Sequence, residues 1–168
     1  MNFVSVMFAS PVYDELVQIR LQSLYIPLEA EINIEAFAQE YKDVHLAVYD
    51  VKSQLIGAVV AKVCEEEDEF MNKRKICLLK QVVVKPKLQR LGLGKELMAN
   101  LEQLLISKGY KEIRLYAHIG AMDYYGKMGF VKHGKPFSGA GIKQHTLKKK
   151  IQKKSDKLHR LEAVGYES

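Results

Sequence analysis

The stretch with the clearest capacity for chemistry is Gln89–Gly94, QRLGLG, in which glycines stand one residue apart. It follows an apolar run, VVVKPKL, and opens an amphipathic run, KELMANLEQLLISKGY, which predicts a turn from a buried strand into a helix. A helix begins with unpaired N–H groups and roughly half a positive charge, which suits a phosphate. Glycine allows the backbone to approach such a ligand closely. The stretch therefore predicts a phosphate cradle made by the backbone around Leu91–Lys95.

The spacing excludes the two commonest phosphate-binding glycine motifs. A dinucleotide fingerprint needs a third glycine, but Leu97 stands three residues after Gly94. A Walker loop needs a lysine followed by serine or threonine, whereas Lys95 is followed by Glu96. The prediction of a cradle thus depends on the place of the glycines between strand and helix, and an ordinary strand-to-helix turn is the alternative.

Apolar periodicity predicts the elements that hold this stretch in place. The run 76–84, ICLLKQVVV, is apolar apart from Lys80 and Gln81, which is typical of a central strand buried on both faces. Ser10 with Pro11, and Asn33, fit the start of two helices. The segment 65–75 is predicted as a polar loop. The order βααβββαβαββ predicts an α/β protein with a mixed sheet, with strands at 2–9, 44–50, 53–66, 76–84, 112–118, 129–134 and 144–151, and helices at 12–25, 34–43, 93–109 and 121–128.

Length and composition predict a single domain over residues 1–151. The chain has 168 residues, of which 48% are hydrophobic and 27% charged. No apolar segment approaches the ~18 residues that span a bilayer, and the N-terminus lacks the basic and apolar regions of a secretory signal. Cys64 and Cys77 lack metal-ligand spacing and fit buried free thiols in a reducing compartment. We therefore expect a cytoplasmic protein with no metal and no membrane contact.

The net charge of +6 is concentrated near the C-terminus. The segment 148–160, KKKIQKKSDKLHR, carries most of the excess, and residues 152–168 are predicted to be a basic appendage. Such a segment attracts nucleic acid or an anionic ligand by its field alone. It has no aromatic residue for base stacking and no recognisable binding module, so a solvated tail is the favoured interpretation and nucleic-acid binding the lesser one.

Two motifs in order carry a family resemblance. The stretch LLKQVVVKPKLQRLGLGKELMANLE resembles the central motif of the GNAT N-acetyltransferases, Gln/Arg-x-x-Gly-x-Gly/Ala, with Gln89, Gly92 and Gly94 at its defining positions. AMDYYGKMGF resembles their second signature, which places Tyr125 at the tyrosine position. The agreement extends from about residue 44 to 150. It implies a GNAT-like acyl-CoA N-acyltransferase fold, a mixed sheet with helices on both faces.

A finer similarity links IRLQSLYIPL, LKQVVVKP and GKPFSGAGIKQH to a bacterial branch of small GNAT acetyltransferases. Lys80 replaces the usual arginine of that branch, Arg90 a frequent glycine, and Gly139 a glutamate. These departures leave the cofactor motif intact, but no substrate preference is transferred from the branch.

The resemblance implies transfer of an acetyl group from acetyl-CoA, a co-substrate, to a primary amine of a small molecule or a protein by direct attack on the thioester. Tyr125 is the implied acid for the leaving thiolate, and the adjacent Tyr124 is expected in the core. The central strand is expected to pair with the pantetheine arm and to polarise the thioester oxygen. The expected cofactor contacts are Val82, Val83, Val84, Gln89, Arg90, Leu91, Gly92, Leu93, Gly94, Lys95 and His118.

Several roles stay open at this level. Arg90 and Lys95 fit phosphate contacts or solvated surface charges, and His118 fits a pantetheine contact or a loop histidine. The general base is not identified: His118, His145, an acid from residues 65–69 and a water chain are all candidates, and Glu112 stands only at the start of its strand. A non-catalytic acyl-CoA-binding module is the alternative function. The expected partners are acetyl-CoA and an amine, and a homodimer stays open.

Overall fold

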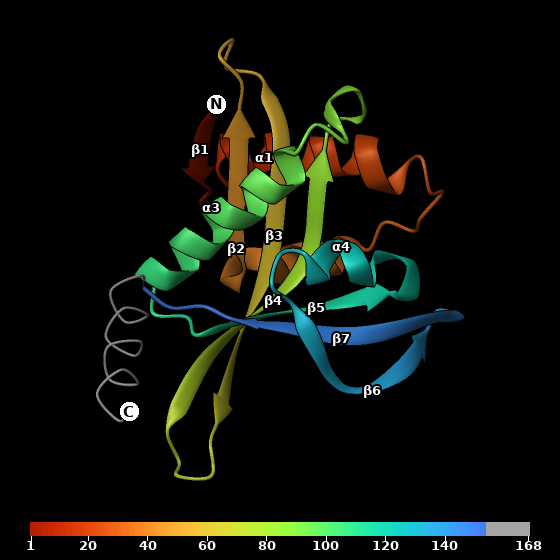
Figure 1. The fold of residues 1–168 in the computed structure, drawn as a ribbon. Helices are drawn as coiled ribbons and strands as arrows, with labels where there is room; N and C mark the ends of the chain where they lie inside the picture. Colours follow the sequence, from red (N-terminus) through yellow and green to blue (C-terminus); the bar gives the residue numbers. More distant parts are fainter. Residues whose placement is uncertain (154–168) are drawn as a thin grey trace.

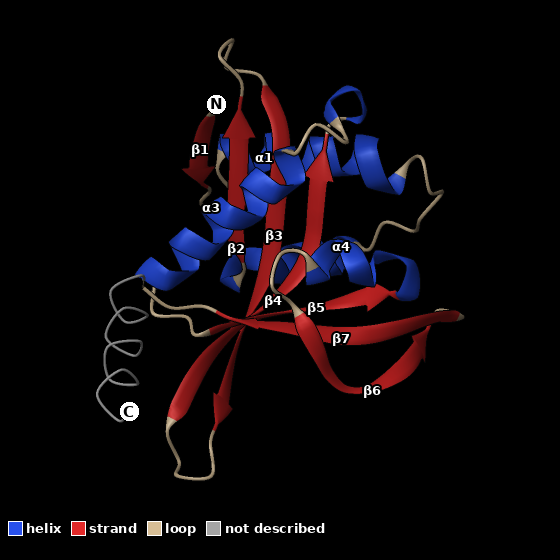
Figure 2. Ribbon diagram, in the orientation of Figure 1, coloured by secondary structure: helices blue, strands red, loops and turns tan. Residues whose placement is uncertain are grey.

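A seven-stranded mixed sheet with helices on both faces is formed by residues 1–153, the part of the chain that the computed structural model describes (Figures 1 and 2). The strand order is β1-β2-β3-β4-β5-β7-β6. Every neighbouring pair is antiparallel except β4 and β5. The predicted order of elements is confirmed. The strands are β1 (Asn2–Ser5), β2 (Val44–Tyr49), β3 (Leu55–Glu67), β4 (Lys73–Val84), β5 (Glu112–His118), β6 (Val131–Gly139) and β7 (Ile142–Lys150).

The helices begin where the capping residues predict. Helix α1 (Pro11–Arg20) starts after Ser10, whose side chain accepts the N–H of Tyr13 at 3.2 Å, and Pro11 occupies the first turn. Helix α2 (Ile34–Ala38) starts after Asn33, whose side chain accepts the N–H of Ala36 at 3.1 Å. Both predictions are confirmed. The helices continue as a π turn, Leu21–Tyr25, and a 3₁₀ turn, Gln39–Lys42, and the remaining helices are α3 (Leu93–Ser107) and α4 (Met122–Gly126).

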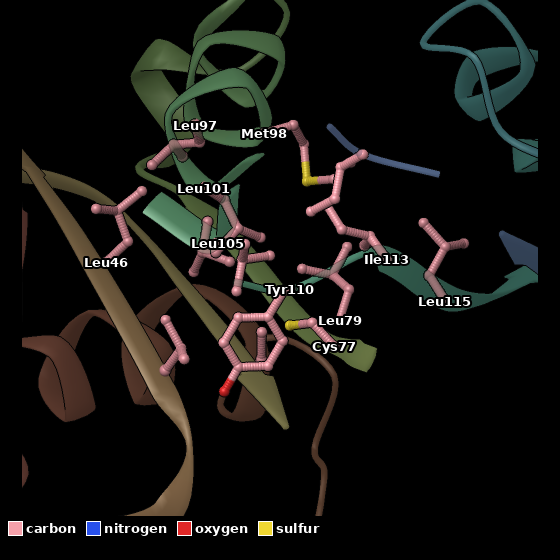
Figure 3. Packing of buried hydrophobic residues seen from close by; sticks show 14 of the residues in the cluster. Leu46, Cys77, Leu79, Leu97, Met98, Leu101, Leu105, Tyr110, Ile113 and Leu115 are labelled. Carbon is pink, nitrogen blue, oxygen red and sulfur yellow. The ribbon is translucent and has the colours of Figure 1, made fainter. Parts of the chain in front are cut away.

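The two faces of the sheet have separate apolar clusters. Helix α1 covers one face, where Leu16 and Ile19 pack with Ala58 and Val60 of β3. Helix α3 crosses the other face in front of β2 and β3 (Figure 1). It presents an apolar stripe at helical spacing to the sheet, as predicted. Figure 3 shows four of these residues facing Leu46, Cys77, Leu79 and Ile113; the buried stripe comprises Leu93, Leu97, Met98, Leu101 and Leu105.

The prediction of a polar loop over 65–75 is wrong, because β3 and β4 continue as a long hairpin. Opposite charges face each other across the two strands, with Glu65 opposite Lys75 and Glu67 opposite Lys73. Such cross-strand pairs favour the extended ladder in a segment with no apolar pattern. Only 68–72 forms the tip, where the Asp68 carboxylate accepts the N–H of Phe70 at 2.9 Å and closes the turn. The hairpin projects from the body of the protein (Figure 1).

Within residues 1–153 the structure contains no helix long and apolar enough to cross a membrane. Cys64 and Cys77 are free thiols, and burial raises the pKa of Cys77 to about 12. The predicted basic appendage, 152–168, lies outside the described residues apart from its first two positions. Its role therefore stays a prediction.

Gly57 sets how closely α3 approaches the central strands. A Cβ at this position would lie 3.0 Å from the Val83 carbonyl oxygen and 3.1 Å from a methyl group of Leu97. We expect Gly57→Ala to lower the free energy of unfolding by about 1–3 kcal/mol through overpacking. Urea denaturation measures this change. Gly126→Ala is the matched control, because a Cβ there would lie within 4 Å of none of the other described side chains; equal stabilities for the two variants would contradict the close packing.

Candidate active site

Strands β4 and β5 pair only where they begin and then separate. Parallel pairing joins Ile76–Leu78 to Glu112–Arg114, whereas β4 continues to Val84 and β5 to His118. The two arrows diverge visibly in Figure 1. The end of β4 therefore borders a gap in the sheet on the side that faces β5.

The backbone at the end of β4 offers hydrogen-bonding groups to this gap. The N–H of Lys85 donates to the Ile56 carbonyl of β3 at 3.0 Å. Backbone groups point alternately to the two sides of a strand, so those of Val84 and Val82 point away from β3 and into the gap. The Gln89 side-chain amide donates to the Val84 carbonyl at 3.1 Å from that side. An extended ligand that enters the gap can pair with these groups as an added strand would.

A pocket of about 500 Å³ opens between the end of β4, the start of α3 and α4. It brings together side chains from the glycine stretch, the central strand and the second signature, which are up to about 40 positions apart in the sequence. The lining residues are Val82, Val84, Leu88, Gln89, Arg90, Gly92, Gly94, Lys95, Tyr124 and Tyr125.

The start of α3 has the form of an open anion site. Gly92 occupies the N-cap position at φ 85°, in the left-handed region that favours glycine, and no side chain caps the helix. The N–H groups of the first turn therefore stay available to a ligand in the pocket. Arg90 also has a positive φ of 65°. A non-glycine residue there carries about 1 kcal/mol or more of backbone strain, which is common at ligand-binding turns.

Gly92→Asp is expected to weaken CoA binding at least about tenfold, because it adds a carboxylate where a phosphate would approach. A Cβ at Gly92 meets nothing within 4 Å, so the loss comes from charge and from the positive φ rather than from a clash. Gly92→Asn is the matched control, since it has the same size and tolerates the same φ without the charge. Calorimetry with CoA measures both. Equal affinities for the two variants would contradict a phosphate at this turn.

Tyr125 lies at the inner end of the pocket and is half-buried against the apolar core. Its ring meets Tyr124 edge-on at 5.1 Å and Phe130 at 5.9 Å. Burial, with a smaller contribution from Tyr124, raises the pKa of Tyr125 above its ordinary value. The phenol therefore keeps its proton in water and releases it only to a base that forms beside it.

The expectation that Tyr124 packs in the core is wrong. Tyr124 is 44% exposed and lines the same pocket as Tyr125, on the side of the glycine stretch. Helix α4 is a short turn with no buried residue, so consecutive side chains can both reach the pocket. The aromatic pair in AMDYYGKMGF was the available signal, but sequence alone did not distinguish which ring faces inward.

Four predicted site residues do not line the pocket. The side chains of Val83 and Leu93 are buried, Val83 in the cluster beneath α1 and Leu93 in the cluster beneath α3. Leu91 is 74% exposed, and His118 is exposed at the end of β5. For Leu91 and Leu93 the prediction stays one about backbone N–H groups. The backbone of Val83 faces β3 by the alternation described above, so it does not reach the gap.

No predicted general base is among the pocket-lining residues. Glu112 is fully buried and accepts hydrogen bonds from Arg74 and Arg114. His145 is buried, with Nδ1 2.9 Å from the Thr146 carbonyl oxygen. The acidic residues of 65–69 lie on the projecting hairpin (Figure 1). The pocket thus contains an acid candidate, Tyr125, and no carboxylate or imidazole.

A buried charged network that the sequence did not indicate lies beneath α1, on the opposite side of β4. Arg20 and Glu40 form a two-pronged ion pair at 2.8 and 2.7 Å, and they are 1% and 2% exposed. The Tyr13 hydroxyl donates to the same carboxylate at 3.0 Å. The Arg20 Nε donates to Gln81 on β4 at 2.6 Å, and Gln81 donates to the Tyr25 hydroxyl at 2.9 Å. The network thus connects α1 and the 3₁₀ turn after α2 to the central strand beside Val82.

The network meets β4 at a β-bulge. Val60 of β3 pairs with Gln81 and the next residue with Leu79, so Lys80 is the extra residue. The bulge turns the polar pair Lys80 and Gln81 to the α1 side, where Lys80 reaches Asp43 at 3.0 Å and Glu40 at 3.5 Å. This explains the only polar interruption in the apolar run of the central strand.

A larger pocket of about 690 Å³ lies between α1 and α2. Its lining is mostly apolar, and Asp14 is its one charged side chain. It contains neither glycine nor a basic residue, so it does not fit phosphates. The described residues also contain no group of three or more His, Cys, Asp or Glu that could hold a metal ion.

The family comparison agrees with the geometry. A family model described as "Acetyltransferase (GNAT) domain" matches residues 26–151, which is most of the chain. No curated protein sequence matches.

Solved structures share the fold at low sequence identity. An aminoglycoside 6'-N-acetyltransferase complexed with coenzyme A has a TM-score of 0.68 at 17% identity, over 90% of this chain and 97% of its own. A GNAT acetyltransferase from Elizabethkingia anophelis with acetyl-CoA bound has a TM-score of 0.63 at 17% identity, over 89% and 97%. An acyl-CoA N-acyltransferase from Pseudomonas aeruginosa has a TM-score of 0.68 at 18% identity, over 88% and 98%. The chain therefore has the GNAT fold and belongs to the GNAT acetyltransferase family.

Proposed function

We propose that this protein is an acetyl-CoA-dependent N-acetyltransferase that moves an acetyl group to a primary amine by direct attack on the thioester. The observation that carries the proposal is the single pocket that joins an uncapped, glycine-rich helix start to Tyr125 along the open side of β4. One end suits phosphates, the strand suits an amide-bearing arm, and the inner end holds an acid. The groups that these three regions suit are the diphosphate, the pantetheine arm and the thioester sulfur, which follow one another in this order in acetyl-CoA.

Residues of this chain account for cofactor binding, polarisation of the thioester and protonation of the leaving sulfur. The first turn of α3 and the cations Arg90 and Lys95 hold the diphosphate. The backbone of Val82 and Val84 pairs with the pantetheine arm, and an N–H of this pair polarises the thioester oxygen. The amine nitrogen forms a bond to the acetyl carbon while the C–S bond breaks. The departing sulfur takes the Tyr125 proton, and the amine releases its proton to water.

The raised pKa of Tyr125 keeps the phenol protonated at neutral pH, so the proton is present when the C–S bond breaks. A CoA thiol ionises near the ordinary thiol value of about 8.5, so a thiol holds a proton less tightly than the phenol at equilibrium. Complete proton transfer to the thiolate is therefore unfavourable at equilibrium. The phenol assists by donating its proton as charge accumulates on sulfur, and it recovers a proton from the product thiol or from solvent afterwards.

The proposed acceptor is a primary amine of a small molecule or a protein. The related structures include an aminoglycoside acetyltransferase, and at 17% identity that name does not transfer. We infer that a small-molecule or protein amine enters from the α1 side of the gap, where Gln81 and Tyr25 lie beside Val82. A cytoplasmic location, a domain that ends near residue 151 and a basic appendage remain parts of the same proposal.

Two measurements test it. Calorimetry with CoA tests the pocket, and incubation of acetyl-CoA with a broad panel of amines and peptides, followed by mass detection of acetylated product, tests turnover. Binding with turnover supports the proposal. Binding without turnover on any amine would instead support a non-catalytic acyl-CoA-binding module. Absence of CoA binding by the folded protein would overturn both.

A further inference from the structure

Among the described residues, Tyr124 is the one aromatic side chain of the pocket that the mechanism above leaves without a role. It extends from α4 toward the start of α3, while its ring meets Tyr125 at an interplanar angle of 75°. The space around Gly94 shows where the Tyr124 hydroxyl lies. A Cβ built on Gly94 would lie 3.0 Å from the Tyr124 hydroxyl oxygen, and among the described residues outside its own helix backbone and chain neighbours no other heavy atom lies within 4 Å.

This contact explains why residue 94 is a glycine, which its backbone conformation does not explain. Gly94 does not have a positive φ, so a side chain at this position would be disfavoured by lack of space and not by the backbone conformation. The space is filled by a hydroxyl that faces the first turn of α3, whose N–H groups are uncapped. A phenolic O–H can donate to an anion that already accepts from those N–H groups.

We propose that the Tyr124 hydroxyl binds the diphosphate of CoA and makes the site selective for the phosphorylated cofactor. The inference rests on the proposed function, because it assigns a residue to the same pocket. The geometry supports it in three ways: the hydroxyl lies 3.0 Å from a Cβ built on Gly94 at the positive end of α3, Lys95 lines the same pocket, and Tyr124 is exposed enough to meet a ligand. The oxygen donates its proton to a phosphate oxygen, and no covalent bond changes.

The role of Tyr124 differs in kind from that of Tyr125. A phosphate contact is made equally in the ground state and the transition state, so its loss raises KM for acetyl-CoA and leaves kcat nearly unchanged. If Tyr124 served only to pack against Tyr125, its hydroxyl would be dispensable for KM. If it only oriented Tyr125, its loss would lower kcat.

Tyr124→Phe removes the hydroxyl and keeps the ring. We expect Kd for CoA to rise about tenfold, the effect of one charge-assisted hydrogen bond at a partly exposed site. Affinity for S-acetylpantetheine, which has no phosphate, should stay as in the wild type. Tyr41→Phe is the control, because Tyr41 is also exposed and lies beside Phe8, away from the pocket. Thermal melting checks that all variants fold.

Gly94→Ala gives an independent test, because it pushes the hydroxyl out of place. We expect Gly94→Ala to weaken CoA binding severalfold in the wild type, and to have a smaller effect when Tyr124→Phe has already removed the oxygen. Such non-additivity supports the assignment.

Three outcomes would overturn it: an unchanged Kd for CoA in Tyr124→Phe, an equal loss for CoA and S-acetylpantetheine, or fully additive effects of the two substitutions. These failures are distinct from failure of the proposed function, in which the wild type itself would not bind CoA or would not turn it over.

Discussion

Tyr125→Phe is expected to lower kcat about a hundredfold while KM for acetyl-CoA changes little. The substitution removes the proton donor and keeps the ring that packs against Phe130. General acid assistance is typically worth about a hundredfold or more, and the CoA thiolate is a moderately good leaving group, which favours the lower end of that range. The contact strengthens only as the C–S bond breaks, so it appears in kcat rather than in substrate binding.

The measurement uses steady-state release of CoA with an amine identified in the panel, together with the melting temperature. A hydroxyl that serves only in packing would cost about 1 kcal/mol of stability and leave kcat intact. The pH profile adds a second check. Burial holds the pKa of Tyr125 above its ordinary value of about 10. Loss of the Tyr125 proton should therefore not limit the wild-type rate at any pH below about 10. A folded variant with wild-type kcat would remove Tyr125 from the mechanism.

The parts of the fold that were predictable are those whose cause is local. Ser10 and Asn33 satisfy N–H groups three residues away, and the stripe of α3 follows from its own spacing. The glycine stretch was predictable for the same reason, because the backbone at position 92 is left-handed at the start of a helix and favours glycine. The family motif therefore predicted the side of the pocket formed by α3.

The features that escaped prediction depend on partners far apart in the chain. Nothing near Arg20 in the sequence indicates that Glu40 and Gln81 will surround it, since 20 and 61 positions separate them. An arginine in an amphipathic helix is ordinarily a surface residue. The expectation that Tyr124 packs in the core was wrong for another reason: a short helix gives no periodicity from which to assign an inner face.

The buried network and the pocket lie on opposite sides of one strand. The bulge at Lys80 turns Gln81 toward Arg20, and beyond it the groups of Val82 and Val84 face the gap. The network thus holds β4 from the α1 side at Gln81, the residue next to Val82 in the proposed reaction centre. Because Arg20 donates hydrogen bonds through three nitrogen atoms in this network, we infer that the network keeps β4 in a fixed geometry.

Arg20→Met is accordingly expected to cause the largest loss of stability of any substitution considered, about 3–5 kcal/mol at pH 7. Methionine approximates the length of the side chain but leaves the Glu40 carboxylate buried with its main partner removed, which is the costly way to break a buried ion pair. Urea denaturation measures the loss. The double variant Arg20→Met/Glu40→Gln removes both charges and should be more stable than Arg20→Met alone.

The pH dependence separates this charge effect from lost packing. Although burial raises it, hydrogen bonds from His45, Arg20 and Tyr13 hold the pKa of Glu40 below its ordinary value, so in the wild type Glu40 contributes stability above about pH 4.3 that is lost as pH falls. In Arg20→Met the carboxylate loses its two-pronged partner and keeps Lys80 at 3.5 Å, so protonating it relieves the cost of a less compensated buried charge. The stability difference between variant and wild type should therefore narrow as pH falls from 7 toward 4. A difference that stays constant over that range would show that Arg20 contributes through packing and not through its charge.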